Sequence, residues 1–399
     1  MKTIFPVLAI CFCLHSAVFA QQSNLRDTLL ADSLFRMAEM FADSAEYDSI
    51  IVYLKKASMI YEEVKDWEKH INCSIGTGIA YLETGKYKKA FEYFNLALLI
   101  GEGEDLSNVL NESRAYSGIG IIYQQQGDYF QALEFHEKAL NIFLKEFGQN
   151  HSHAAEIYNN IAIIYYYQNN YIQASDFLQK ALKIWVNQLG DNHPSIAIVY
   201  DNIGSIYIAQ AHYYKALEFK QKALTIRLNT LSENHPDVAL SYNNVGFLFH
   251  IQGDYLKAHE HYQKALKIWV NQLGNNHPKV AAIYDNIGSI YADQANCSKA
   301  LEYGQKALAI RLSILGENHP DVALSYNNIG SALEMKGNYI EALNYFWKAL
   351  AIQVKLSTEN NPEIANIYNN IGAVFDTQGN YSKAIEYYQK ALRIFINGL

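Results

Sequence analysis

The sequence predicts an all-α protein, a solenoid of about nine stacked helical hairpins, and three observations lead to this fold class. The dipeptide His-Pro occurs at His193, His235, His277 and His319, which defines an exact 42-residue period. Small and apolar residues recur in phase with this dipeptide at the spacing of helical faces. Half of the 399 residues are apolar and 18% are charged, which excludes a disordered chain and a coiled-coil rod.

The register of the repeat is defined by its small residues. When position 1 is placed at Ala155, position 4 is tyrosine in every unit from there to the C-terminus, and positions 20 and 27 are alanine. Position 8 is glycine or alanine. The same register extends back to residue 71 and, after a slightly shorter step, to residue 31. The solenoid is therefore predicted at 31–398, after a lead-in at 21–30, with units that start at residues 31, 71, 113, 155, 197, 239, 281, 323 and 365.

Each unit is predicted to contain two antiparallel helices. Apolar residues at positions 4, 7, 8 and 11 share one face of a first helix, and those at positions 20, 23, 24 and 27 share one face of a second. Gly-Asp-Tyr or Gly-Asn-Tyr between them, as at Gly127, ends the first helix and turns the chain. Small residues at positions 8, 20 and 27 let the two helices approach closely. Because one hairpin cannot bury both apolar faces, the hairpins must stack.

The His-Pro dipeptide marks the exit from each second helix and the start of the next first helix, where the fixed φ of proline is tolerated. Histidines one repeat apart should lie roughly 10 Å from each other, too far to share a metal ion. The histidines are therefore predicted to be structural, and no metal site is expected.

The first twenty residues resemble a secretory signal. A single cation, Lys2, precedes an apolar stretch from Ile4 to Leu14, and Ala20 is a small residue suited to cleavage. Neither this stretch nor any later one approaches the roughly 20 apolar residues of a membrane span. We expect residues 1–20 to be a signal peptide and the protein to be exported, periplasmic or secreted. Only Cys73 and Cys297 would remain after cleavage, and an exported chain without a disulfide favours a bacterial periplasm.

The pattern Tyr-x-x-Ile-Gly-x-x-Tyr, then Gly-Asp/Asn-Tyr, then Ala-x-x-Tyr-x-x-x-Ala-Leu resembles the tetratricopeptide repeat. The 42-residue period is more similar to the long-helix repeats of kinesin light chains, nephrocystin-type proteins and many bacterial arrays. This resemblance implies a right-handed α-solenoid that serves as a protein-protein interaction scaffold. It also implies that an extended peptide or partner protein binds in the concave groove lined by the first helices.

A polar pair stands at positions 5 and 6 of each first helix from residue 155 onward, although asparagine is a mediocre helix former. By the resemblance, these side chains face the groove and bind the main chain of the peptide. An alternative is that the amides tie neighbouring repeats together, or that they are relics of duplication. The candidate groove residues are Asn160, Asn202, Asn244, Asn286, Asn328 and Asn370 at position 6, with Asn159, Asn243 and Asn327 at position 5.

The charge pattern suggests which partner the groove accepts. The net charge of −8 argues against nucleic acid. After Arg114 the first helices carry no lysine or arginine at positions 2, 5, 6 or 9. Acidic residues lie on or near the same face, namely Asp201, Asp285, Asp293, Glu334 and Asp376. The groove is therefore predicted to be neutral to acidic, and the partner to be neutral or basic.

The sequence has no motif that predicts an enzyme: no nucleophile elbow, phosphate loop, paired cysteines or zinc-protease helix occurs. We expect a non-catalytic protein without a cofactor. The alternative function is structural. The array ends on an apolar second helix without a polar cap, so copies of the chain could self-assemble into a homo-oligomer through Ile394 and Phe395.

A longer internal period, twice that of the hairpin, overlies the repeat. Residues 184–207 nearly recur at 268–291, which indicates an 84-residue duplication of a pair of hairpins. Within this pair, position 24 alternates between an aromatic residue, Tyr262 or Phe346, and a non-aromatic one, Lys220 or Gly304. This alternation suggests either a two-repeat rhythm in the shape of the groove or neutral drift.

Overall fold

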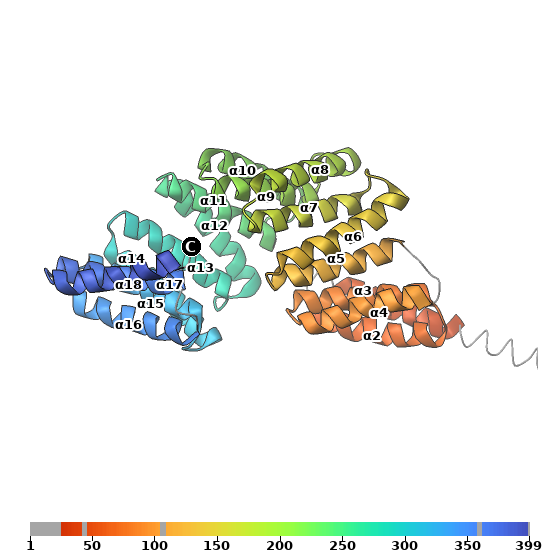
Figure 1. The fold of residues 1–399 in the computed structure, drawn as a ribbon, viewed down its shortest axis with the longest axis horizontal. Coiled ribbons are helices and arrows are strands. Elements are labelled where there is room, and N and C mark those ends of the chain that lie inside the picture. The colour runs from red at the N-terminus through yellow and green to blue at the C-terminus, as the bar shows by residue number, and fades with distance from the viewer. Residues whose placement is uncertain (1–24, 42–45, 104–108, 357–360, 398–399) are drawn as a thin grey trace, which may run out of the picture. The chain divides into compact units, whose positions relative to one another are not determined.

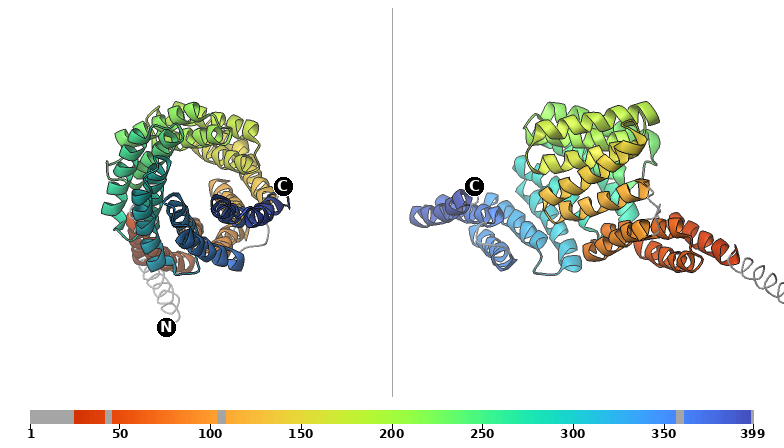
Figure 2. Two further views of the ribbon diagram at one scale, coloured as in Figure 1. Left: turned by 90° about the vertical axis from the view of Figure 1, so that its left-hand side faces the viewer. Right: turned by 45° about the vertical axis from the view of Figure 1, so that its right-hand side comes forward.

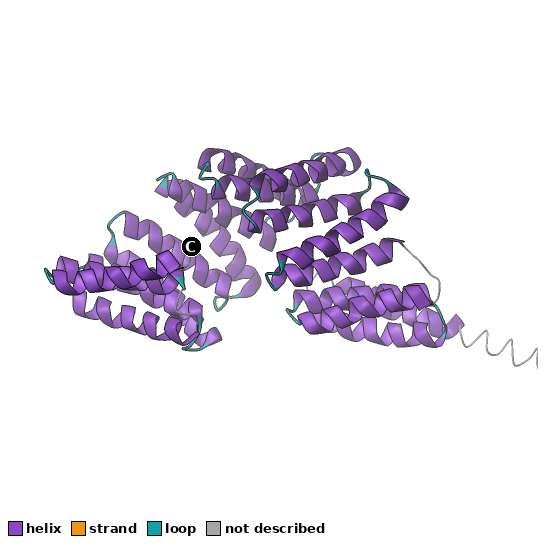
Figure 3. Ribbon diagram, viewed as in Figure 1, coloured by secondary structure: helices purple, strands orange, loops and turns teal. Residues whose placement is uncertain are grey.

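The computed structural model describes residues 25–41, 46–103, 109–356 and 361–397, and all regular structure in these ranges is helical (Figure 3). Residues 1–20, the expected signal peptide, lie outside them. None of the described helices is long and apolar enough to cross a membrane. Residues 25–41 are helical and precede α2 (Tyr47–Glu63), α3 (Trp67–Glu83), α4 (Tyr87–Gly103), α5 (Val109–Gln125), α6 (Tyr129–Phe147), α7 (Ser152–Tyr167), α8 (Tyr171–Leu189), α9 (Pro194–Ala209), α10 (Tyr213–Thr230), α11 (Pro236–Ile251), α12 (Tyr255–Leu273), α13 (Pro278–Asp293), α14 (Cys297–Leu315), α15 (Pro320–Met335), α16 (Tyr339–Leu356), α17 (Pro362–Thr377) and α18 (Tyr381–Asn397).

Consecutive helices pair as antiparallel hairpins, which the labelled ribbon and its further views show (Figures 1 and 2). The chain divides into two compact units, Met1–Asp191 and Asn192–Leu399. The first unit contains the hairpins α3–α4, α5–α6 and α7–α8, and the second contains five hairpins from α9–α10 to α17–α18. Residues 25–41 and α2 precede these eight hairpins, and Tyr61 of α2 donates a hydrogen bond to Asp32. The predicted all-α array of helical hairpins is confirmed.

Within each unit the first helices of successive hairpins lie closer to each other than the second helices do. In the second unit α13 contacts both α11 and α15, and α15 contacts α17; in the first unit α5 contacts both α3 and α7. Successive second helices among those described make no contact of this extent. A stack that is tighter on one side curves toward that side, so the first helices line the inner face of each unit.

The turn inside each hairpin from α3–α4 to α17–α18 contains a residue in the left-handed conformation. Glycine takes this position at Gly127, Gly253 and Gly379, with φ of 75° to 79°. The same conformation is held by Ala211 at φ 58° and by Ala295 at φ 55°, where an L side chain is strained. The aspartate or asparagine after the left-handed residue usually accepts a hydrogen bond that caps the N-terminus of the second helix. This is the role of the Asp/Asn in the predicted Gly-Asp/Asn-Tyr turns.

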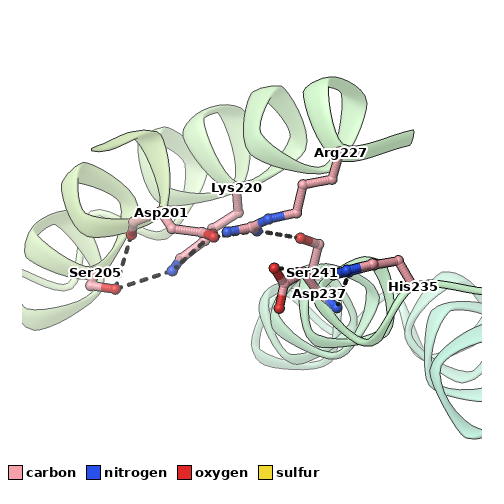
Figure 4. Close-up of polar contacts among 7 residues, drawn as sticks. All are labelled: Asp201, Ser205, Lys220, Arg227, His235, Asp237 and Ser241. Carbon is pink, nitrogen blue, oxygen red and sulfur yellow. Dashed lines mark hydrogen bonds and ion pairs between the residues drawn. The ribbon is translucent and has the colours of Figure 1, made fainter. Parts of the chain in front are cut away.

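The recurrent histidines cap the first helices. His235 Nδ1 accepts a hydrogen bond from the backbone N of Asp237 at 3.1 Å (Figure 4), and Pro236 occupies the first helical turn. His151, His193, His277 and His319 accept the same bond at 3.1 to 3.2 Å. The capping bond explains why histidine recurs at this position, in addition to its place in the predicted turn. Among the described residues, no group of three or more His, Cys, Asp or Glu side chains is placed to hold a metal ion.

The glycine at position 8 packs directly under the side chain at position 24 of the same hairpin. A Cβ on Gly330 would lie 2.6 Å from the buried ring of Phe346, and one on Gly246 would lie 2.9 Å from Tyr262. These distances explain why position 8 is small, as the sequence predicted. In the hairpin α13–α14, position 24 is Gly304, so no side chain from it covers Gly288.

Candidate functional site

The asparagines at position 6 form a ladder between neighbouring hairpins of the second unit. Three of them, Asn286, Asn328 and Asn370, donate their Nδ2 to the side-chain oxygen of the residue at position 5 in the preceding hairpin. The three bonds run from Asn286 to Asn243 at 2.9 Å, from Asn328 to Asp285 at 3.3 Å, and from Asn370 to Asn327 at 2.9 Å. We call these six residues the amide ladder. They support the alternative in which the amides tie repeats together, and the amides of Asn286, Asn328 and Asn370 each have a second N–H and an oxygen besides this bond.

The remaining predicted groove residues lie at the equivalent places on first helices. Asn160 lies in the first unit, and Asn202 and Asn244 in the second; all three are half-buried. Asn159 is buried at 7% exposure. The structure therefore places all nine predicted asparagines on first helices, and whether they bind a peptide remains a prediction.

A buried ion network surrounds Asp201, the position-5 residue of α9 (Figure 4). From α10, Lys220 Nζ lies 3.3 Å from Asp201 Oδ1, and Arg227 Nη1 pairs with Asp201 Oδ2. Lys220 also donates to Ser205 Oγ at 3.1 Å, while Arg227 donates to Ser241 Oγ on α11 at 2.5 Å. Burial lowers the pKa of Lys220, and the nearby carboxylate of Asp201 opposes that shift. The network thus links two hairpins through charged hydrogen bonds.

A second, smaller version of this network lies two hairpins further along the chain. Arg311 Nη1 lies 2.5 Å from Asp285 Oδ2 and donates to Ser325 Oγ at 2.6 Å. Burial raises the pKa of Asp285, and the positive charge of Arg311 opposes that shift. No lysine accompanies this pair, because the counterpart of Lys220 is Gly304.

A pocket of about 180 Å³ occupies the place beside Asp285. It lies among α13, α14 and α15, and its lining includes Asp285, Ser289, Asp293, Gly304 and Asn328. Two of these residues, Asp285 and Asn328, belong to the amide ladder. The pocket therefore opens where the predicted groove residues lie.

The sequence argument for an acidic groove counted only the first helices, and the second helices change the balance. Asp201 and Asp285 are paired with cations at positions 24 or 31 of second helices. Asp293 Oδ2 lies 2.7 Å from Nε2 of His250, which belongs to the first helix α11. The missed signal is the recurrence of arginine at position 31 and serine at position 3 of the next unit, both with the 84-residue period. This pattern singles out Arg227 and Arg311, and the structure shows that they pair with the two aspartates.

The two residues predicted for self-association differ in exposure. Ile394 is buried at 9% and belongs to the core of the last hairpins, so it does not lie on an open surface. Phe395 is 44% exposed, and its neighbours Leu392 and Ile396 are 57% and 62% exposed. The exposed apolar surface of α18 therefore includes Leu392, Phe395 and Ile396.

The chain belongs to the tetratricopeptide repeat family. The family model matches residues 111–185, 153–229, 237–313, 305–355 and 321–397. These segments cover more than half of the chain, and they confirm the resemblance inferred from its motifs. No curated protein matches the sequence.

Solved structures share the fold at low sequence identity. The apo form of RapI is 17% identical with a TM-score of 0.65, covering 92% of this chain and 97% of its own. The apo quorum sensor NprR from B. thuringiensis is 17% identical with a TM-score of 0.64, covering 90% and 99%. A Rap protein complexed with the competence and sporulation factor is 16% identical with a TM-score of 0.59, covering 93% and 98%. At such identities the likeness shows the fold.

Proposed function

We propose that the protein is a non-catalytic scaffold that binds an extended peptide or a partner protein along the first helices of its hairpins. The observation that carries this proposal is the amide ladder, a row of half-buried amides at 42-residue intervals on adjoining first helices. Asn286, Asn328 and Asn370 each use one N–H for the bond to the preceding hairpin, and each amide has a second N–H and an oxygen that a peptide could engage. That pairing suits a peptide main chain, which offers a donor and an acceptor at every residue.

Two further observations support the same function. The tetratricopeptide repeat family is generally one of non-catalytic scaffolds, and a Rap protein with this fold is seen complexed with the competence and sporulation factor. The pairing of Asp201 and Asp285 with buried cations neutralises two of the aspartates on the first helices. We therefore expect a neutral or basic peptide as the partner and no nucleic acid.

Replacement of Asn286, Asn328 and Asn370 by alanine tests the proposal. Asn187, Asn229 and Asn271 lie exposed on second helices, and their replacement by alanine provides a matched control. Residues 21–399 of each variant would capture proteins from an envelope extract of the native host. Circular dichroism must first show that both variants fold.

A partner retained by the wild type and the control, and lost from the ladder variant, would support the proposal. Equal capture by all three proteins would assign the ladder to contacts between repeats alone. The loss of hydrogen bonds should then appear as lower stability, about 1 kcal/mol for each bond.

Export is part of the proposal. We expect cleavage after Ala20, which N-terminal sequencing of the protein from its native host would test. A protein that begins at Met1, or that stays in the cytoplasm, would contradict export.

Self-assembly through α18 is the second candidate function. Leu392, Phe395 and Ile396 present an exposed apolar surface that a second copy of the chain could cover. If so, light scattering should show a mass that rises with concentration and a Phe395→Glu variant that stays monomeric. A wild-type protein that remains monomeric at all concentrations would exclude this function.

A further inference from the structure

The pocket beside Gly304 has an internal counterpart that shows what can fill it. Residues 201, 205, 220, 227 and 241 correspond to residues 285, 289, 304, 311 and 325 across the 84-residue duplication. Aspartate, both serines and arginine are the same in the two sets, and only Lys220 and Gly304 differ. The second set is therefore the first one without its lysine side chain.

In the hairpin α9–α10, the alkyl chain of Lys220 covers Gly204. A Cβ on Gly204 would lie 3.0 Å from Lys220 Cγ and Cε. A Cβ on Gly288 would meet nothing closer than Tyr303 Cβ at 3.4 Å, and nothing from Gly304 except its backbone N at 3.9 Å. The pocket of about 180 Å³ lies where the lysine chain would run. Its size is adequate for a short chain, since an engineered cavity of roughly 150 Å³ in another protein holds benzene.

The polar end of the pocket also matches the surroundings of the lysine. Lys220 Nζ contacts Asp201 Oδ1 at 3.3 Å and Ser205 Oγ at 3.1 Å. Their counterparts Asp285 and Ser289 both line the pocket, together with Asp293, whose Oδ2 also contacts His250 Nε2 at 2.7 Å. No cationic side chain is among the lining residues. Arg311 beside Asp285 does not preclude a second cation, because Lys220 and Arg227 share Asp201 in the same way.

From these correspondences we propose that the pocket among α13, α14 and α15 binds the side chain of a lysine carried by the bound peptide. The ammonium group contacts Asp285 and Ser289, and the alkyl chain lies over Gly288. A lysine of a peptide is favoured over a free amine because Asp285 and Asn328 belong to both the pocket and the amide ladder. The inference rests on the proposed function and deepens it by naming one side chain of its ligand.

The first test uses n-butylammonium as the probe, with n-butanol as its neutral control, and measures thermal stability and NMR shifts of the full chain. Butylammonium should bind the wild type at α13, α14 and α15, and butanol should not. Gly304→Lys fills the pocket with the chain's own lysine, so it should abolish this binding. Lys220→Gly opens a second pocket, so butylammonium should raise its melting temperature by more than that of the wild type.

A second variant keeps the test valid if Gly304→Lys alone does not fold. A Cβ on Gly304 would lie 3.1 Å from Ile329 Cγ1, whereas the counterpart of Ile329 beside Lys220 is the smaller Val245. Gly304→Lys combined with Ile329→Val therefore reproduces the α9–α11 arrangement. If either filled variant folds and still binds butylammonium at the same residues, the proposal is wrong. It is also wrong if the wild type binds butanol as well as it binds butylammonium.

The second test identifies the source of the ammonium group. An acetylated and amidated pentapeptide with a central lysine between alanines is compared with its norleucine analogue and with butylammonium. The lysine peptide should bind at least about tenfold more tightly than the norleucine peptide, as a charged hydrogen bond would provide. It should also bind more tightly than butylammonium. Butylammonium that binds as tightly as the lysine peptide would overturn the assignment to a peptide lysine.

The two proposals can fail separately. If butylammonium binds the pocket and no peptide binds the ladder, the groove function is wrong and the ammonium site is a site for a free amine. If partner proteins are captured through the ladder and Gly304→Lys leaves that capture unchanged, the groove function stands and the lysine pocket is wrong.

Discussion

The same substitution, glycine to alanine at position 8, should have opposite effects in two neighbouring hairpins. Alanine in a helix interior is more favourable than glycine by about 1 kcal/mol. At Gly288 the new methyl group meets only ordinary contacts, the nearest being Tyr303 Cβ at 3.4 Å, because position 24 is Gly304. Gly288→Ala should therefore increase the free energy of unfolding by about 1 kcal/mol.

At Gly330 the new methyl group would collide with a buried ring. Its Cβ would lie 2.6, 2.8 and 3.0 Å from ring atoms of Phe346, which is fully buried and cannot move aside. Overpacking of this kind costs about 1–3 kcal/mol, which exceeds or cancels the gain in helix propensity. Gly330→Ala should therefore be less stable than the wild type by about 1 kcal/mol.

Urea unfolding of the full chain would compare the two variants, with hydrogen exchange in α13 and α15 as a local measure of stability. Local exchange is needed because repeat arrays can lose two-state behaviour. A change of the same sign at both glycines would refute the idea that the side chain at position 24 decides the space above position 8.

Three further predictions concern single residues elsewhere in the described helices. Ala211→Gly should increase the free energy of unfolding by about 1 kcal/mol and so raise the melting temperature, because alanine at φ 58° is strained. A lower melting temperature would count against strain at this turn. Burial lowers the pKa of His136 from 6.5 to about 4, so the unfolded chain takes up its proton first as the pH falls. The contribution of neutral His136 to the free energy of unfolding is therefore fully present above pH 6.5. It decreases by about 3 kcal/mol as the pH falls from 6.5 to 4. His136→Phe should remove that part of the pH dependence in urea unfolding, and an unchanged slope would contradict the assignment. Arg311→Met should destabilise by about 3–5 kcal/mol because it leaves Asp285 buried without its partner, whereas Arg311→Met with Asp285→Asn should recover most of the loss. Equal melting temperatures for the single and double variants would show that the ion pair is not the cause.

The repeat made most of the fold predictable. A strict period with glycine or alanine at position 8 and alanine at positions 20 and 27 can be satisfied only where two helices touch along small residues. Each hairpin packs through contacts between residues that are close in the sequence, so its structure follows from local spacing. The turns and the first-helix positions of all nine asparagines followed from the same register.

The candidate site was less predictable, because its partners come from other helices. Asp201 looked like a free charge on a first helix, yet Lys220 and Arg227 approach it from the second helix of the hairpin. The recurrent histidines indicated a turn, and only the structure showed that Nδ1 caps the following helix. Sequence spacing within one helix carries no information on such pairings between helices.

The sequence by itself determined the family, the hairpin and its register, because the contacts that specify them lie within about one repeat of the chain. Only the tertiary structure decided where the polar side chains find their partners and where none is present. Lysine at residue 220 is replaced by glycine at residue 304, its counterpart in the 84-residue duplication. That difference separates a filled ion network from a pocket of about 180 Å³, since a void is defined by the atoms of three helices at once.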